Sequence, residues 1–249
     1  MKSNKLIKYK KITHNFFNKT GGTSTGIYKS LNCGIGSKDK KSSILKNIKF
    51  VTKKIGCKND KLILMNQVHS SKIIEVKKSF KKKIIGDGLF TSKPGLALGI
   101  LTADCAPILM YDKKLEFIGA AHAGWKGAYK GVALKLASYF VKKGSKKKNL
   151  IVVIGPCIKK NSYEVKSNFK RKFLLKNKKN FRFFTKKNEK IYFDLPNFIK
   201  FQLIEFGVKN IEIINKDTFK RGNNFFSARY SISKKYDDYG RNISIIMIK

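Results

Sequence analysis

Hydrophobic residues along this chain gather in short runs that are separated by polar and lysine-rich stretches. Short continuous apolar runs of this kind are typical of buried strands. The pattern predicts strands at Leu62–Met65, Ile73–Val76, Ala97–Thr102, Pro107–Tyr111, Leu115–Ala121, Leu150–Ile154, Asn210–Ile214 and Ile243–Ile248.

Helical spacing appears in three further segments. In Gly127–Lys143 the apolar residues fall on one stripe, as they do in an amphipathic helix. A second helix is predicted at Val165–Leu175. A third begins near Asp194, a residue suited to cap a helix N-terminus, and runs to Phe206, after which Gly207 favours a stop.

The order of these elements predicts the fold class. Strands and helices are interleaved, and the first half of the chain is dense in strands. No Pro/Ser-rich linker and no internal repeat divides the 249 residues. We therefore expect an α/β (α+β) protein, a mixed β-sheet sandwich flanked by helices, with one domain over residues 1–249. The lysine-rich stretch Lys77–Lys83 is expected to be an exposed loop.

The charge of the chain is extreme, because 56 lysines and arginines face 15 acidic residues and give a net charge of +41. Such a charge commonly indicates nucleic-acid binding. However, only five of these residues are arginines, the preferred readers of phosphates and base edges, and the lysines run along the whole chain. Lys, Asn and Ile are all abundant, as A/T-rich codons produce. We therefore interpret the charge as compositional drift and expect nucleic acid to bind only non-specifically, by charge.

Composition also bears on the compartment. No apolar run approaches the ~20 residues that a membrane helix needs. The basic N-terminal segment lacks the apolar stretch of a signal peptide. We expect a cytoplasmic protein without membrane contact. None of the four cysteines forms a CxxC pair, which argues against a structural zinc knuckle.

Polar, reactive side chains follow three of the predicted strands. His69 follows the run at Leu62–Met65, Cys105 follows Ala97–Thr102, and His122 follows Leu115–Ala121. One thiolate and two imidazoles with an open fourth position form the donor set of a catalytic zinc site. Alternatively, Cys105 is a small buried hydrophobe and the histidines are hydrogen-bonded loop residues.

Glycine-rich segments offer a second kind of site. In Lys19–Ser24, backbone N–H groups, hydroxyls and a cation are suited to hold an anion such as phosphate, although a plain turn has the same composition. Gly124–Gly127 opens a predicted helix, where free N–H groups also favour an anion. Asp104, next to Cys105, is suited to act as a base, as an orienting group or as a cap.

Three of these segments resemble the signature motifs of a known family. Asn66–His69 (NQVH), Thr102–Pro107 (TADCAP) and Ala121–Gly127 (AHAGWKG) are similar to those of the bacterial laccase-domain proteins. This family is also called the polyphenol oxidase or purine nucleoside phosphorylase family, and in some bacteria peptidoglycan editing factor. Further matches occur in chain order at Lys19–Ser24, Ser30–Asn32, Asp87–Gly88, Ile154–Ile158, Tyr163–Val165, Phe225–Arg229 and Gly240–Arg241.

The resemblance implies an α/β sandwich with Zn²⁺ held by His69, Cys105 and His122. The implied activity is phosphorolysis of adenosine, inosine or methylthioadenosine to free base and ribose 1-phosphate, and adenosine deamination is also attributed to the family. The substrates are thus a purine nucleoside and phosphate. A multicopper centre needs roughly ten histidines, and this chain has three. A single Cu²⁺ on two histidines and one cysteine remains open.

The resemblance and the chemistry together suggest roles for individual residues. Cys105, His122 and Asp104 are the expected catalytic groups, with Asp104 as the proton carrier in deamination. Lys19 stands where the family usually has arginine. Its ammonium group is a point charge, whereas a guanidinium donates two parallel hydrogen bonds to a phosphate. The expected phosphate contacts are Lys19, Ser24, Lys126 and Arg229. The residues expected to orient ribose or base are Asn32, Gln67 and Asp87.

Two other classes of function stay open. A cysteine hydrolase acting on a peptidoglycan-related amide would use Cys105 as nucleophile and His122 as base. Because a simple dyad does not need His69 and a metal site does, His69 discriminates between them. A non-enzymatic RNA- or envelope-binding protein is suggested by Phe169–Lys190, where Phe alternates with Lys and Arg, although the same aromatic residues also suit a core.

Overall fold

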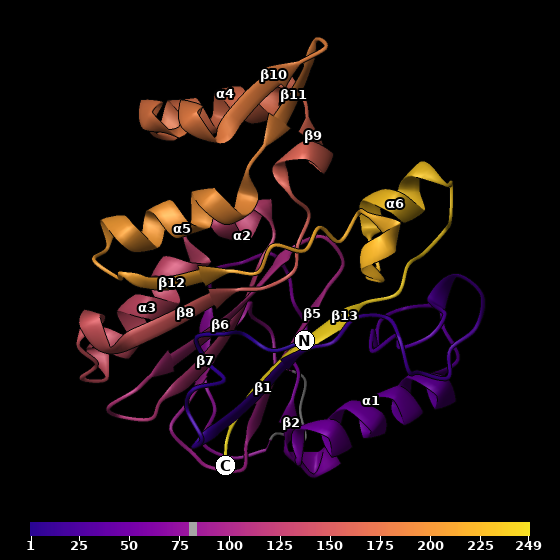
Figure 1. Ribbon diagram of the computed structural model, residues 1–249, viewed down its shortest axis with the longest axis vertical. Coiled ribbons are helices and arrows are strands. Elements are labelled where there is room, and N and C mark those ends of the chain that lie inside the picture. The colour runs from indigo at the N-terminus through magenta and orange to yellow at the C-terminus, as the bar shows by residue number, and fades with distance from the viewer. Residues whose placement is uncertain (80–83) are drawn as a thin grey trace.

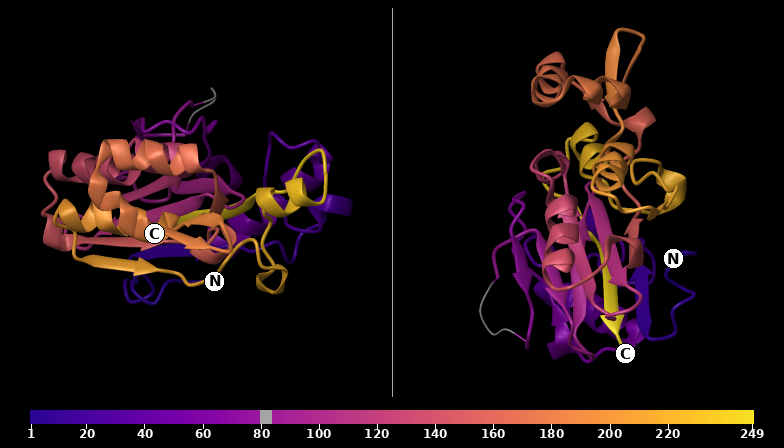
Figure 2. Two further views of the ribbon diagram at one scale, coloured as in Figure 1. Left: turned by 90° about the horizontal axis from the view of Figure 1, so that it is seen from above. Right: turned by 90° about the vertical axis from the view of Figure 1, so that its left-hand side faces the viewer.

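Two β-sheets face each other at the centre of the protein, whose computed structural model describes residues 1–79 and 84–249 (Figures 1 and 2). One sheet has the strand order β1-β13-β5-β2, and the other has the order β12-β8-β6-β7-β4-β3. The strands are β1 (Ile12–Phe16), β2 (Leu62–Ile63), β3 (Ile73–Glu75), β4 (Gly88–Thr91), β5 (Ala97–Thr102), β6 (Ala106–Asp112), β7 (Ile118–Ala123), β8 (Leu150–Ile154), β12 (Asn210–Ile213) and β13 (Asn242–Ile248).

Alternation of side chains explains why these strands are apolar throughout. In β8, Leu150, Val152 and Ile154 pack in the cluster that faces the helices. Ile151 and Val153 point the other way, into the cluster between the two sheets. Both faces are buried, so the strand shows a continuous apolar run. All eight predicted strands are present, with ends that differ by a few residues.

Helices cover the outer faces of the sandwich and confirm the predicted fold class. On the six-stranded sheet lie α2 (Trp125–Tyr129), α3 (Val132–Lys142) and α5 (Leu195–Glu205). The four-stranded sheet is covered by α1 (Lys41–Ile55), which buries Val51 and Ile55 against β13. The sequence analysis did not predict α1, β1 or β4.

The helix predicted at Gly127–Lys143 is wrong in one respect, because two helices occupy this segment. Gly131 separates α2 from α3 with a φ of 76°, a left-handed conformation that interrupts a helix. The prediction for α5 is confirmed: the Asp194 side chain accepts a hydrogen bond from the Asn197 backbone N–H at 3.2 Å. Gly207, with a φ of 99°, follows its end.

A third, small sheet stands apart from the sandwich, at the top of Figure 1. It contains β9 (Glu164–Val165), β10 (Phe184–Lys187) and β11 (Lys190–Phe193), and α4 (Ser167–Lys176) packs on it. The helix predicted at Val165–Leu175 therefore begins later, after β9. Phe173 and Phe193 are fully buried here with ring centroids 4.9 Å apart. Phe169 stacks on Phe173 with ring centroids 4.8 Å apart, so aromatic residues of the Phe169–Lys190 segment form a core together with Phe193.

One further short helix, α6 (Ala228–Ser233), precedes β13. Residues 80–83 of the predicted loop Lys77–Lys83 lie outside the described residues. Among the helices of the described residues, none combines the length and the apolar character needed to cross a bilayer.

The N-terminal segment is fastened to the sandwich by a buried histidine. His14, on β1, is 2% exposed, and its Nε2 accepts a hydrogen bond from the Ser3 backbone N–H at 2.8 Å. Burial and the charge of Lys2 lower the pKa of His14 to about 4, against the opposing effect of Glu212. The ring is therefore neutral in the folded protein over a pH range in which the unfolded chain is protonated.

We predict that His14 makes the free energy of unfolding fall as the pH drops from about 6.5 to about 4. The unfolded state binds the proton first in this window, so the stabilisation present above pH 6.5 is lost progressively, by about 3 kcal/mol in total. His14→Gln keeps an acceptor for Ser3 but cannot titrate. Urea unfolding at a series of pH values gives the free energy of unfolding as a function of pH. This free energy should fall less steeply with decreasing pH in the variant than in the parent, and an equal fall in both would contradict the prediction.

Candidate active site and metal centre

A cavity of about 510 Å³ lies where several strands end, a size usual for small-molecule sites. Its walls come from distant parts of the chain. They are the loop at Gly34–Gly36, the segment after β2, the end of β5, His122 on β7, and Tyr239 with Arg241 just before β13. Leu64, Met65 and Leu101 make part of the wall apolar.

His69, Cys105 and His122 meet at this cavity. Their donor atoms lie within 4.8 Å of one another, and the Cys105 Sγ is 3.9 Å from the His69 Nε2. In a tetrahedral zinc site the donors are roughly 3.5 Å apart, so small side-chain movements bring the three around one ion. The spacing of polar residues at strand ends thus located three side chains that the fold brings together.

The backbone around this trio is held in unusual conformations. His69 has a φ of 56° and Asp104 a φ of 83°, and both values lie in the left-handed region that few residues other than glycine adopt. Such conformations persist where surrounding contacts enforce them, and they are frequent at functional sites. Here they turn the chain sharply beside two of the three donors.

The Asp87 carboxylate organises two of the three donor residues. It is fully buried, and its Oδ1 lies 2.8 Å from the His122 Nδ1. The same carboxylate accepts hydrogen bonds from the backbone N–H groups of Val68, His69 and Ser70 at 3.2, 3.0 and 2.6 Å. The Ser70 hydroxyl donates a further bond at 2.7 Å. Asp87 therefore fixes the orientation of one imidazole and the loop that carries the other.

Charge interactions tune the thiol and the imidazole. Burial raises the pKa of Cys105, but the charge of His122 and hydrogen bonds to both histidines outweigh it and bring the pKa to about 7. Burial lowers the pKa of His122, while the charges of Cys105 and Asp87 and their hydrogen bonds raise it to about 9. Cys105 is thus readily present as a thiolate, the form that binds metals and attacks electrophiles.

Gly124 leaves the space that the donors occupy. A Cβ atom at this position would lie 2.7 Å from the Cys105 Sγ and 2.8 Å from the His69 Cδ2. The φ of Gly124 is −68°, which any residue adopts, so the requirement for glycine is steric. The first glycine of the motif Ala121–Gly127 therefore makes room for the metal-capable side chains.

Asp104 lies next to Cys105, but its carboxylate faces the C-terminal segments. Its Oδ1 accepts from the Thr218 hydroxyl at 2.7 Å. Its Oδ2 accepts from the Ser227 hydroxyl at 2.9 Å and from the Arg229 backbone N–H at 2.7 Å. Burial raises the pKa of Asp104 against these bonds. The residue ties two distant loops to the end of β5.

Two predicted substrate-binding residues lie at the cavity or beside it. Gln67 lines the cavity, and its amide pairs with the Leu101 backbone through bonds of 2.7 and 2.9 Å. Asn32 is fully buried, and its Oδ1 accepts from the backbone N–H groups of Gly34 and Arg241, both at 2.9 Å. Asn32 therefore shapes the loop at one side of the cavity.

The four predicted phosphate contacts are more scattered. Lys19 lines a separate cavity of about 440 Å³. The buried Ser24 hydroxyl donates to the Asp39 carboxylate at 2.6 Å and accepts from Asn47 at 2.9 Å. Lys126 is exposed on α2, and the Arg229 guanidinium lies 5.5 Å from the Tyr163 ring centroid. Of the predicted site residues, the cavity walls contain His69, Cys105, His122 and Gln67.

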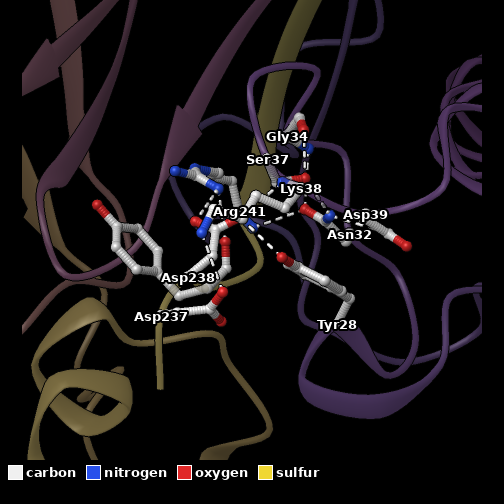
Figure 3. Close-up of polar contacts among 10 residues, drawn as sticks. Tyr28, Asn32, Gly34, Ser37, Lys38, Asp39, Asp237, Asp238 and Arg241 are labelled. Atoms are coloured by element: carbon white, nitrogen blue, oxygen red, sulfur yellow. Dashed lines mark hydrogen bonds and ion pairs between the residues drawn. The ribbon is translucent and has the colours of Figure 1, made fainter. Parts of the chain in front are cut away.

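Sequence reasoning missed several residues of the site. Ser70, Tyr239 and Arg241 were given no role, although Ser70 directly follows the NQVH motif and Arg241 lies in a segment that matches the family. Figure 3 shows the polar network around Arg241, which joins the loop near Asn32 to the segment at Asp237–Arg241. Nothing in the local sequence places this arginine beside the three donors.

A comparison with known protein families shows to which family the chain belongs. A family model described as multi-copper polyphenol oxidoreductase laccase matches residues 13–249. The chain therefore belongs to this laccase-like family. Purine nucleoside phosphorylase RP494 of Rickettsia prowazekii is 34% identical over 246 residues, which cover 98% of this chain and 99% of the relative. The purine nucleoside phosphorylase of Bacteroides thetaiotaomicron is 31% identical over 260 residues, covering 98% and 94%.

Solved structures share the fold. The hypothetical protein YfiH of Bacillus licheniformis superimposes with a TM-score of 0.88 at 28% identity, covering 96% of this chain and 93% of that one. YlmD of Geobacillus stearothermophilus gives a TM-score of 0.87 at 25% identity, with the same coverage of 96% and 93%. The mixed α/β architecture is thus that of the YfiH/YlmD proteins.

We predict that Asp87→Asn weakens metal binding by about 10–100-fold, the usual effect of removing a carboxylate behind a histidine ligand. The variant keeps the shape of the side chain but loses the charge that holds His122 and the Val68–Ser70 loop. Competition with a coloured chelator measures the affinity. Asp60→Asn, at an exposed carboxylate, is the matched control. An unchanged affinity in Asp87→Asn would contradict this role.

We also predict that Gly124→Ala disrupts the donor trio. The added methyl group must displace the Cys105 Sγ or the His69 ring, and such overpacking costs about 1–3 kcal/mol of stability. Metal content after purification and the urea midpoint report the two effects. Gly222→Ala is the control, because a Cβ there meets nothing within 4 Å. A variant that is as stable and as metal-rich as the parent argues against the steric account.

Proposed function

We propose that this chain is a metal-dependent purine nucleoside phosphorylase. It breaks the bond between C1′ of the ribose and the purine nitrogen, and it forms a bond from C1′ to a phosphate oxygen. The purine leaves with a proton, and the products are free base and ribose 1-phosphate. The observation that carries the proposal is the meeting of His69, Cys105 and His122 at one cavity in a chain whose full-length relatives are named purine nucleoside phosphorylases.

The three donors fit zinc. Two imidazoles and one thiolate leave a fourth tetrahedral position for substrate or water. The Nδ1 of His122 is engaged by Asp87, which leaves its Nε2 for the ion, as in carboxylate–histidine–zinc arrangements. When bound, such an ion supplies Lewis-acid stabilisation of a negatively charged oxygen. Adenosine, inosine and methylthioadenosine are the substrates we propose, and adenosine deamination is a further activity of the same centre.

The residues of the chain have their own tasks in this scheme. Asp87 holds His122 and the His69 loop in place, so the donors need no reordering when substrate arrives. Leu64, Met65 and Leu101 offer an apolar wall for the flat purine ring. Gln67 fixes the end of β5 next to Cys105 through its paired bonds with Leu101. The site is thus assembled in advance on strands of the sandwich.

Copper enters the proposal only as a single ion. The family description names a multi-copper oxidoreductase. Such centres need roughly ten histidines, whereas this chain has His14, His69 and His122. His14 is buried at the Ser3 contact, so two histidines remain at the cavity. A mononuclear copper polyphenol oxidase is therefore the alternative that metal analysis and phenol oxidation assays address.

A second candidate function is a cysteine hydrolase. The lowered pKa of Cys105, about 7, and its contact with His122 suit a thiolate nucleophile paired with an imidazole. This reading leaves His69 without a role, although its Nε2 lies 3.9 Å from the thiol. The position of His69 therefore favours the metal-dependent reaction.

The test is an assay of adenosine turnover with and without phosphate on salt-washed, metal-analysed protein. His69→Ala and Cys105→Ala are compared with His14→Gln and Cys57→Ala, which change the same residue types elsewhere. We expect adenine and ribose 1-phosphate only when phosphate is present. We also expect about one metal ion per chain in the parent and both controls, and loss of activity and metal in the two site variants.

Other outcomes separate the alternatives. Equal activity in the site variants and the parent means that a contaminating phosphorylase is responsible, and the proposal fails. Inosine formed without phosphate assigns deamination. Amide hydrolysis that persists after chelation and in His69→Ala, but not in Cys105→Ala, assigns the hydrolase. The cytoplasmic location stays a prediction, which fractionation of the producing cells would check.

A further inference from the structure

We propose that Arg241 forms the phosphate-binding subsite of the cavity, where it holds inorganic phosphate as the co-substrate. This inference rests on the proposed function for the role of the phosphate, and it adds a residue that the sequence analysis did not select. Lys19, Ser24, Lys126 and Arg229 were the expected contacts there.

The guanidinium of Arg241 presents a free edge. Its Nη1 donates to the Asp238 Oδ1 at 3.1 Å and to the Tyr239 carbonyl at 2.6 Å. Among the described residues, its Nε and Nη2 have no hydrogen-bond partner, and in Figure 3 these nitrogens point away from Asp238. A guanidinium edge with parallel N–H groups matches two oxygens of a phosphate.

The support of Arg241 is rigid. The guanidinium lies 4.4 Å from the Tyr239 ring centroid. The Asp238 carboxylate that holds it is itself fixed by the Tyr28 hydroxyl and the Lys38 backbone N–H, both at 2.8 Å. These bonds keep the pKa of Asp238 below its usual value against the effect of burial. A prearranged cation loses little side-chain entropy when an anion binds.

The stem of Arg241 is confined as well. Its backbone N–H donates to the Asn32 Oδ1 at 2.9 Å, and its carbonyl accepts from the Cys33 N–H at 3.1 Å. A Cβ at Gly34 would lie 2.3 Å from the Arg241 Cδ, so the glycine lets the loop close on this side chain. Two distant segments of the chain therefore cooperate to place one guanidinium at the cavity.

The distribution of cations singles out this residue. The chain has 56 lysines and arginines, yet Arg241 is the only one of either type among the described residues that line the cavity. The high lysine content of the chain explains why lysines cover the surface. It does not explain why a single arginine lies among the apolar and metal-capable residues of the cavity wall. Among the described residues, its carboxylate partner is Asp238, which contacts Nη1. Arg241 thus lines the cavity with two guanidinium nitrogens that no described protein group engages.

A direct binding experiment tests this assignment. The metal-loaded protein is dialysed against radiolabelled inorganic phosphate in 0.3 M KCl, a salt concentration that screens surface charge. The variants are Arg241→Gln, Arg241→Lys, Lys19→Gln as the rival site, and Lys93→Gln as a charge-matched control in a third cavity. Metal content and the thermal midpoint are measured for each.

We expect Arg241→Gln to weaken phosphate binding by about 10–100-fold, as the loss of charge-assisted hydrogen bonds does. Arg241→Lys, which keeps the charge but not the fork, should recover part of the affinity. Lys19→Gln and Lys93→Gln should bind phosphate like the parent. Metal content should be the same in all, which separates an anion contact from collapse of the site.

Three results would overturn the assignment. They are parental phosphate affinity in Arg241→Gln, loss of affinity in Lys19→Gln but not in Arg241→Gln, and Arg241-dependent binding of adenosine 5′-phosphate without binding of inorganic phosphate. In turnover assays Arg241→Gln should raise the KM for phosphate and leave that for the nucleoside unchanged. If the parent binds phosphate through Arg241 but turns over no nucleoside, the proposed function fails and the anion subsite stands.

Discussion

The site depends on one buried carboxylate. Asp87 accepts bonds from His122, from three consecutive backbone N–H groups and from the Ser70 hydroxyl. Burying a charge is costly unless hydrogen bonds satisfy it, and here five donors surround one side chain. Burial raises the pKa of Asp87, but these bonds bring it below its usual value and keep the group ionised. The positions of both imidazoles follow from this single anion.

The strands of the sandwich could be predicted because both of their faces are buried, which leaves an unbroken apolar signal in segments such as Leu150–Ile154. Helix α1 was missed although the sequence carries its signal, because Ile44, Val51 and Ile55 recur at helical spacing and lysines occupy most of the opposite, exposed side. Gly131 was read as part of a helix, since only its left-handed backbone, set by the packing of α2 and α3, reveals the break. Local patterns thus fail where tertiary contacts decide the conformation.

The site, like the fold, has a part that local sequence reveals and a part that tertiary contacts decide. The three donor residues are visible in the sequence because each lies near the end of an apolar run. His69 and Cys105 follow strands of the four-stranded sheet, His122 lies at the end of β7 in the six-stranded sheet, and all three line one cavity. The groups that hold the site together are not visible, since the hydrogen bond between His122 and Asp87 spans 35 residues and that from Ser227 to Asp104, beside Cys105, spans 123. Arg241 reaches the cavity through contacts with Asn32, more than 200 residues earlier. No spacing rule connects such pairs.

The position of β13 has a consequence for how the cavity is completed. This strand lies between β1 and β5 in the four-stranded sheet, although it follows every other strand along the chain. Until it is inserted, β1 has no partner in the sheet and the segment that carries Tyr239 and Arg241 has no fixed place. A nascent chain already contains His69, Cys105 and His122, but its cavity lacks one wall. The cavity is therefore complete only when β13 has entered the sheet, and a chain without this strand carries the three donors but not their full binding site.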